Sequence, residues 1–177
     1  LSTTAPYATT KHGQCFFREA HVRLLHASQR AMIVRLRNAH FDDLIYVLHA
    51  PHKGHATDKP ADFWREVKKL ARKWPPSFVL TDLNGRLGPG DSVHGGSVTN
   101  DEYIGDDDNG NELHKLCLDS ELSVANTLCP HSPCHTFHHS SQTLHRIDFV
   151  CIPTYLTGAV DACQVLYDVD TLGAKED

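Results

Sequence analysis

The sequence lacks a long hydrophobic run, an internal repeat and any low-complexity segment. A helix that crosses a bilayer needs roughly 20 consecutive apolar residues, so the first of these absences excludes a membrane span. The chain also lacks an initiator Met and the basic-then-apolar layout of a secretion signal. We therefore expect a fragment or excised domain of an intracellular protein, nuclear or cytoplasmic, and nothing in the pattern implies an oligomer.

Strong positive charge is also missing, because the 177 residues carry a formal net charge of −5. This balance argues against a strong general affinity for nucleic acid, since a broad basic face is the usual footprint of such binding. The 14 histidines qualify that conclusion. Their protonation at mildly acidic pH would turn the balance positive.

Length and composition indicate one globular domain over residues 1–177, with residues 1–12 expected to form a loop. The six cysteines are an even number, but the chain is neither short nor evidently secreted, and we expect reduced thiols. Cys117, Cys151 and Cys163 stand within apolar runs, which is typical of small buried side chains.

Hydrophobic periodicity predicts two helices among about nine strands. The clearest helix is 60–74, where apolar residues recur at helical spacing after a Pro suited to a first turn. The second helix begins at a cap supplied by Asn109 or Asn111, and a short turn is expected at 41–43. The predicted strands are 15–17, 22–25, 31–37, 44–49, 78–80, 122–127, 136–137, 146–152 and 160–169. Helices that follow strands favour an α/β (α+β) fold, a two-sheet β-sandwich flanked by helices.

The segment 81–88, Thr-Asp-Leu-Asn-Gly-Arg-Leu-Gly, directly follows the apolar strand 78–80. Asp82 and Asn84 stand at i and i+2, so both side chains can address one ligand. A carboxylate that orients water beside an amide that donates to a phosphate oxygen suits phosphodiester hydrolysis. Arg86 could hold a neighbouring phosphate as a bidentate donor. Because these residues are also common in turns, a tight turn with a surface Arg is the alternative.

Two other predicted strands carry polar residues at informative positions. His49 ends the strand 44–49 directly before Ala-Pro, and Asp148 lies in the largely apolar stretch 144–150. Burying an isolated carboxylate is costly, so Asp148 must be paired or functional. The alternatives are a His that only bonds to a loop, and an ion pair between Asp148 and Arg146.

In this order, these pieces resemble the endonuclease/exonuclease/phosphatase superfamily. The resemblance runs from about residue 33 to residue 177, and the segments 82–88 and 146–149 are its most specific parts. This version looks most like the endonuclease domains encoded by non-LTR retrotransposons. The resemblance implies a deoxyribonuclease-like fold, truncated at both ends, and hydrolysis of phosphodiesters with Mg²⁺, or Mn²⁺, as cofactor.

The resemblance also implies roles for individual residues. His49 would be a general acid, Asp82 would orient or deprotonate the attacking water, and Asn84 would stabilise charge on the phosphate. Asp148 would orient the catalytic His of a closing Ser-Asp-His motif, in which Asp177 is the metal ligand. The His after Asp177 is absent, as are the upstream Asn and the Glu that serves as principal metal ligand. We therefore expect the chain as given to be weakly active or inactive.

The segment before the Arg-Ile-Asp strand offers two interpretations. In the resemblance, Thr136 and Phe137 face the substrate groove, Arg146 contacts substrate, and histidines at 138, 139 and 145 touch the nucleic-acid backbone. The two cysteines and four histidines of 129–139 could instead bind zinc. They lack two clean ligand pairs, however, so a polar loop with incidental histidines is better supported.

The leading hypothesis is a divalent-metal-dependent phosphodiester hydrolase whose partner is DNA, most simply a DNA-nicking endonuclease domain of a retroelement. A second hypothesis keeps the machinery and changes the substrate to a phosphoinositide, a sphingolipid or a nucleotide, which the acidic balance permits. A third hypothesis is an inactive relic or a nucleic-acid-binding module. The missing catalytic residues support it.

Overall fold

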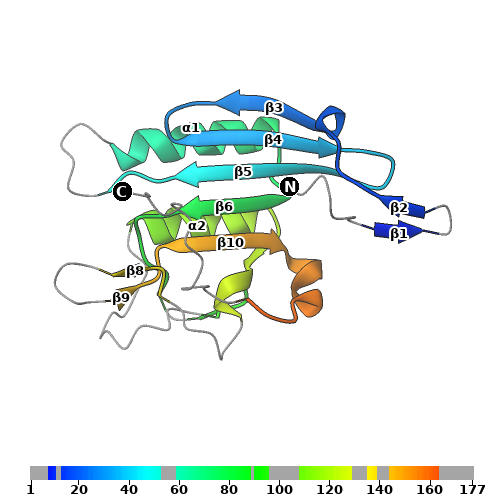
Figure 1. Ribbon diagram of the computed structural model, residues 1–177. Coiled ribbons are helices and arrows are strands. Elements are labelled where there is room, and N and C mark those ends of the chain that lie inside the picture. Colours follow the sequence, from blue (N-terminus) through cyan, green and yellow to red (C-terminus); the bar gives the residue numbers. More distant parts are fainter. Residues whose placement is uncertain are drawn as a thin grey trace, which may run out of the picture.

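The computed structural model describes residues 8–10, 13–52, 59–88, 90–95, 108–128, 135–138 and 144–163. Its centre is a mixed six-stranded sheet (Figure 1). In spatial order, the strands are β3 (Val22–Ala27), β4 (Ala31–Arg37), β5 (Asp42–His49), β6 (Phe78–Asp82), β10 (Asp148–Pro153) and β7 (Leu122–Val124). Neighbouring strands are antiparallel except β5 and β6, which are parallel.

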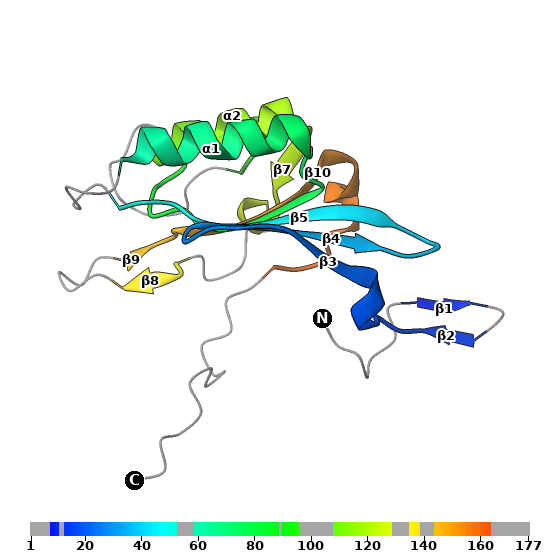
Figure 2. The ribbon, with the colours of Figure 1, turned by 90° about the horizontal axis from the view of Figure 1, so that it is seen from above.

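The parallel pair follows from the helix that joins its strands. α1 (Pro60–Lys73) connects β5 to β6, and a parallel pair requires such a crossover. α2 (Asp108–Asp119) lies beside α1 on the same face of the sheet (Figure 2). Each helix buries one apolar stripe, comprising Phe63, Trp64 and Val67 in α1 and Leu113, Leu116 and Cys117 in α2. These stripes and the sheet face beneath them form the hydrophobic core.

The opposite face of the sheet carries a row of partly exposed apolar side chains. Met32, Val47, Leu80 and Val150 are register partners in turn across four strands. The residues that alternate with them are buried against the helices. Within the described ranges, no second large sheet covers this row, so the α/β class is confirmed and the two-sheet sandwich is not.

Two small antiparallel pairs accompany the main sheet: β1 (Ala8–Thr10) with β2 (Gly13–Cys15), and β8 (Phe137–His138) with β9 (Leu144–His145). Residues 8–10 were expected in a loop and instead form β1. None of the helices in the described part of the chain is long and apolar enough to cross a bilayer.

Several predicted boundaries are wrong for local reasons. Two residues of the expected turn at 41–43 are instead the first residues of β5, where Asp42 pairs with Arg37 of β4. Arg35 of β4 donates two 2.5 Å hydrogen bonds to Asp42 and lowers the pKa of this exposed carboxyl. The strand expected at 122–127 ends at Val124 and continues as the 3₁₀ turn η2 (Ala125–Thr127). Thr127 Oγ1 fixes that turn by donating to Val124 O at 2.6 Å.

The last predicted strand, 160–169, is also absent where the structure describes it. The 3₁₀ helix η3 (Thr154–Ala159) follows β10, and residues 160–163 form no strand. The buried cysteines are confirmed for Cys117 and Cys151, whereas Cys163 is only partly buried. A hydrogen bond with Cys117, together with burial, raises the pKa of the Cys151 thiol.

Candidate active site

Three central strands bring polar residues together on the exposed face of the sheet, where β5 and β6 end and β10 begins. This end of the strands is called the sheet edge below. Asp82 is the register partner of His49 on the parallel side and of Asp148 on the antiparallel side. Each of the three lies two residues along its strand from the exposed apolar row, so all three share that face. The sequence placed these residues on three separate strands, and the topology makes them neighbours.

The Asp82 carboxylate is held at one oxygen and faces a histidine with the other. The Asn84 backbone N–H donates to Asp82 Oδ1 at 3.1 Å. Asp82 Oδ2 lies 3.8 Å from His49 Nε2, beyond hydrogen-bond distance, and 57% of the His49 side chain is exposed. The carboxylate is thus oriented by the backbone, and the imidazole remains accessible to a substrate.

Asn84 occupies a strained turn that fixes its amide. Its φ of 46° lies in the left-handed region, which Asn tolerates better than most residues. Asn84 Nδ2 donates to Ala50 O at 2.9 Å, which ties the turn after β6 to the end of β5. An amide nitrogen carries two hydrogens, so one donation leaves capacity for a second toward a phosphate oxygen.

Asp148 is the carboxylate with the most perturbed environment at this edge. Partial burial raises the pKa of Asp148, and the negative charge of Asp82 raises it further, against an opposing hydrogen bond from Thr136. Two carboxylates on adjacent strands repel each other, and a cation between them would remove that penalty. Their oxygen donors are those that a hard dication such as Mg²⁺ prefers, so these residues fit the expected metal.

Thr136 has a definite structural role beside Asp148. Its Oγ1 accepts hydrogen bonds from the backbone N–H groups of Ile147 and Asp148 at 3.1 and 3.2 Å. The same hydroxyl lowers the pKa of the Asp148 carboxyl by hydrogen bonding, against the effects of burial and of Asp82. Phe137, the next residue, lies on β8 and is 43% exposed. Whether either residue contacts substrate stays a prediction.

The predicted basic ligands lie deeper than a substrate-binding side chain usually does. Arg86 Nη2 and His145 Nε2 are 3.2 Å apart, and His145 is buried. Arg146 is only 5% exposed. Direct contact of these side chains with a phosphate therefore stays a prediction. Asp177, His139 and most of the 129–139 segment lie outside the described residues, as does the His138 side chain.

Asn109 has a central role under this edge that no sequence pattern indicates. Asn109 is not a cap with its side chain turned to its own helix; the side chain is buried. Asn109 Nδ2 donates to Pro51 O and Leu83 O, both at 3.0 Å, and Asn109 Oδ1 accepts from Trp64 Nε1 at 2.9 Å. The loops after β5 and β6 are thus fixed to both helices by one side chain.

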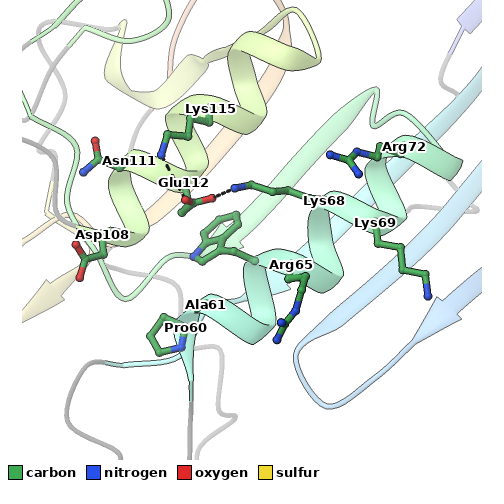
Figure 3. Close-up of a pocket in the computed structure, with 11 residues that line it drawn as sticks. Pro60, Ala61, Arg65, Lys68, Lys69, Arg72, Asp108, Asn111, Glu112 and Lys115 are labelled. Carbon is green, nitrogen blue, oxygen red and sulfur yellow. Dashed lines mark hydrogen bonds and ion pairs between the residues drawn. The ribbon is translucent and has the colours of Figure 1, made fainter.

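A groove in the described part of the chain lies away from these residues. It has a volume of about 1090 Å³ and lies between α1 and α2, on the helix-covered side (Figure 3). Glu112 pairs there with Lys68 and, at 3.4 Å, with Lys115. Most of its charged lining is basic: Arg65, Lys68, Lys69, Arg72 and Lys115. The carboxylates of the sheet edge do not line this groove.

Comparison with known proteins gives a clear result only for structure. No family model and no curated protein sequence matches the chain. Among solved structures, the endonuclease domain of TRAS1, a telomere-specific non-LTR retrotransposon, matches at 15% identity with a TM-score of 0.51; the match covers 89% of this chain and 69% of that one. A 3′-5′ exonuclease (NExo) from Neisseria meningitidis matches at 15% identity, with a TM-score of 0.49 and coverages of 78% and 59%. A mannosyl-6-phosphatase from Bacteroides thetaiotaomicron matches at 14% identity, with a TM-score of 0.42 and coverages of 77% and 54%.

The first of these likenesses establishes the fold. The chain has the α/β fold of that endonuclease domain, which agrees with the fold that the sequence resemblance implies. It spans less than two thirds of the exonuclease and of the phosphatase.

Proposed function

We propose that this chain is the core of a divalent-metal-dependent phosphodiester hydrolase that nicks DNA, as a retroelement endonuclease does. The observation that carries the proposal is the row His49–Asp82–Asp148 across three adjacent strands, with Asn84 fixed beside it. A base, an accessible acid and an amide donor within one small area are the groups that phosphodiester hydrolysis uses.

Three of these side chains have a step that their geometry supports: Asp82, Asn84 and His49. Asp82, whose Oδ1 is held by a backbone N–H, orients or deprotonates the attacking water with its other oxygen. Asn84 donates its second amide hydrogen to a non-bridging phosphate oxygen. His49, accessible at the strand end, donates a proton to the leaving oxygen.

The carboxylates also supply the place for the metal. Asp82 and Asp148 would hold Mg²⁺ or Mn²⁺ from adjacent strands, with Asp177 as a further ligand. When bound, the ion neutralises charge that develops on the phosphate. Thr136 then keeps the Asp148 carboxylate in position through the hydrogen bond from its hydroxyl.

DNA is the favoured substrate because the likeness that establishes the fold is to an endonuclease domain. A nucleotide, a phosphoinositide or a sphingolipid would use the same residues. Hydrolysis of one of those substrates without nicking of DNA would select the alternative and leave the chemistry unchanged.

The test is Mg²⁺-dependent nicking of supercoiled plasmid by this chain and by the chain extended on both sides as its gene encodes. We expect the extended protein to nick, and Asp82→Ala to lose at least about 100-fold of that activity. The matched control is Asp119→Ala, which removes an exposed carboxylate at the end of α2 and should leave nicking unchanged. Circular dichroism of both variants checks the fold. Unchanged nicking by the Asp82 variant would rule out the assignment.

A further inference from the structure

A second cluster of titratable side chains lies away from the sheet edge. Asp91 and His94 belong to the loop 90–95 that follows β6, and His114 belongs to α2. One ligand atom from each residue lies within 4.8 Å of the others. His94 is 1% exposed, whereas Asp91 and His114 retain partial access to solvent at 38% and 25%.

The distances are close to those of a zinc site. Donor atoms bound to tetrahedral Zn²⁺ at 2.0–2.1 Å lie about 3.4 Å apart. Asp91 Oδ2 lies 2.8 Å from His114 Nε2, and Asp91 Oδ1 lies 4.0 Å from His94 Nε2. These two separations stand on either side of that value, and the His94 and His114 ring centroids are 5.4 Å apart. Rotation of the side chains would therefore bring the three donor atoms to the spacing of a zinc site.

The loop that carries two of these side chains is firmly held. Asp91 Oδ1 accepts from the N–H groups of Val93 at 2.7 Å and His94 at 3.2 Å, which closes the turn around the cluster. Val124 N donates to Val93 O at 2.9 Å, and His94 and Val124 form an isolated parallel bridge, so the loop is paired to the end of β7.

Gly95 sets the approach of this loop to the 3₁₀ turn η2. Its N–H donates to Thr127 Oγ1 at 2.9 Å, and a Cβ at this position would lie 2.0 Å from Thr127 O. Such close packing holds the backbone of the loop that carries Asp91 and His94 before any ligand arrives. Little ordering of the backbone is then needed on binding, which favours affinity.

We propose that Asp91, His94 and His114 bind Zn²⁺ and that the ion joins the loop 90–95 to α2. Two imidazoles and one carboxylate are a ligand set typical of zinc, and Mg²⁺ would instead prefer the carboxylate oxygens of Asp82 and Asp148. Water on the exposed side supplies the fourth ligand. The site is distinct from the Cys- and His-rich segment 129–139.

The experiment is calorimetric titration of Zn²⁺ into untagged protein that has been freed of metal with a chelator. Changes to groups that merely orient zinc ligands cost about 10- to 100-fold in affinity, so removal of a ligand should cost at least about 100-fold. We expect that loss in His114→Gln and in Asp91→Asn, whose positions retain solvent access. Titration with Co²⁺ should give visible absorption bands in the wild-type protein that both variants lack.

Two control variants locate the site. His40→Gln removes an exposed histidine from the β4–β5 turn and should retain the zinc affinity. Cys129→Ser with Cys134→Ser should also retain it, which separates this cluster from the 129–139 segment. Failure of the wild-type protein to bind Zn²⁺, or full binding by both ligand variants, would overturn the proposal. Either result leaves the phosphodiesterase proposal standing, because plasmid nicking is measured separately.

Discussion

The sheet-edge site and the Asp91–His94–His114 cluster are built in opposite ways. At the sheet edge, adjacent strands bring oxygen donors into register on an exposed face. In the cluster, a loop and a helix bring two ring nitrogens and one carboxylate together around a buried imidazole. Oxygen donors near solvent suit a hard cation and a phosphate substrate, whereas the nitrogen-rich, sheltered cluster suits zinc. The first arrangement supports the proposed hydrolysis, and the second supports the proposed binding of Zn²⁺.

The largest effect that would sharpen this contrast is expected at His49. If His49 protonates the leaving oxygen, His49→Ala should lower the rate of DNA nicking by the extended protein by about 10²- to 10⁴-fold. The loss should be much smaller on bis(p-nitrophenyl) phosphate, because a nitrophenolate leaves without help from an acid. Steady-state rates on the two substrates measure the difference.

His40→Ala is the control for this experiment, since His40 is exposed and lies in the turn at the other end of β5. An equal loss on both substrates by the His49 variant would show that His49 acts on binding or folding and not on the leaving group. Zinc affinity should be unchanged in both variants.

The next effect concerns Asn109, which supports the sheet edge from below. Asn109→Ala leaves the carbonyls of Pro51 and Leu83 and the Trp64 indole N–H without their partner in the interior. Each unsatisfied buried group costs about 1–3 kcal/mol, so the free energy of unfolding should fall by at least about 3 kcal/mol. Chemical denaturation measures it.

Asn111→Ala is the matched control, because Asn111 is an exposed residue of the same helix. Its effect should stay within about 0.5 kcal/mol. Similar losses in the two variants would mean that helix propensity, and not the buried network, sets the stability here.

These cases show which parts the sequence can predict. The positions of Asp82, Asn84 and His49 at strand ends are predictable because strand period and chain order are local, whereas their roles stay predictions. Asn109 was one of two predicted caps, since Asn ranks high at that position. The packing of α2 under the loops after β5 and β6 turned it inward, and no local pattern encodes that.

The Asp91–His94–His114 cluster is not predictable from the sequence for a similar reason. His114 stands 20 and 23 positions after His94 and Asp91, and this spacing matches no metal-binding motif. The polar stretch between them predicts only a solvated loop. The three meet because Val93 pairs with β7 and α2 packs beside that strand. Sequence patterns predict contacts along one element well, and they do not predict those that depend on how a loop docks.

A smaller effect is expected from Gly95→Ala, which tests how the loop is held. The added methyl would overlap Thr127 O, so the loop must shift away from η2. Overpacking of this kind costs about 1–3 kcal/mol, and the shift should also weaken Zn²⁺ binding while leaving plasmid nicking by the folded protein unchanged. Gly158→Ala is the control, because its Cβ would meet open space. Equal zinc affinity in the two variants would show that loop position does not set the site.

The smallest effect tests the electrostatics of the sheet edge through Asp148. Because burial and Asp82 raise its pKa in the folded protein, the folded state holds this proton more tightly than the unfolded chain does. Stability should therefore fall as pH rises from the ordinary Asp range through the raised pKa, and the deficit should persist at pH 7.

Asp148→Asn removes the charge and keeps an acceptor for Thr136. Without metal, this variant should raise the free energy of unfolding at pH 7 by up to about 1 kcal/mol. The effect is this small because the half-buried group keeps contact with solvent. Denaturation curves should converge with those of the wild-type protein as pH is lowered, and added Mg²⁺ should stabilise only the wild-type protein. A variant less stable than wild type at pH 7 would show that the two carboxylates do not repel each other, which would remove the electrostatic reason for a cation at this edge.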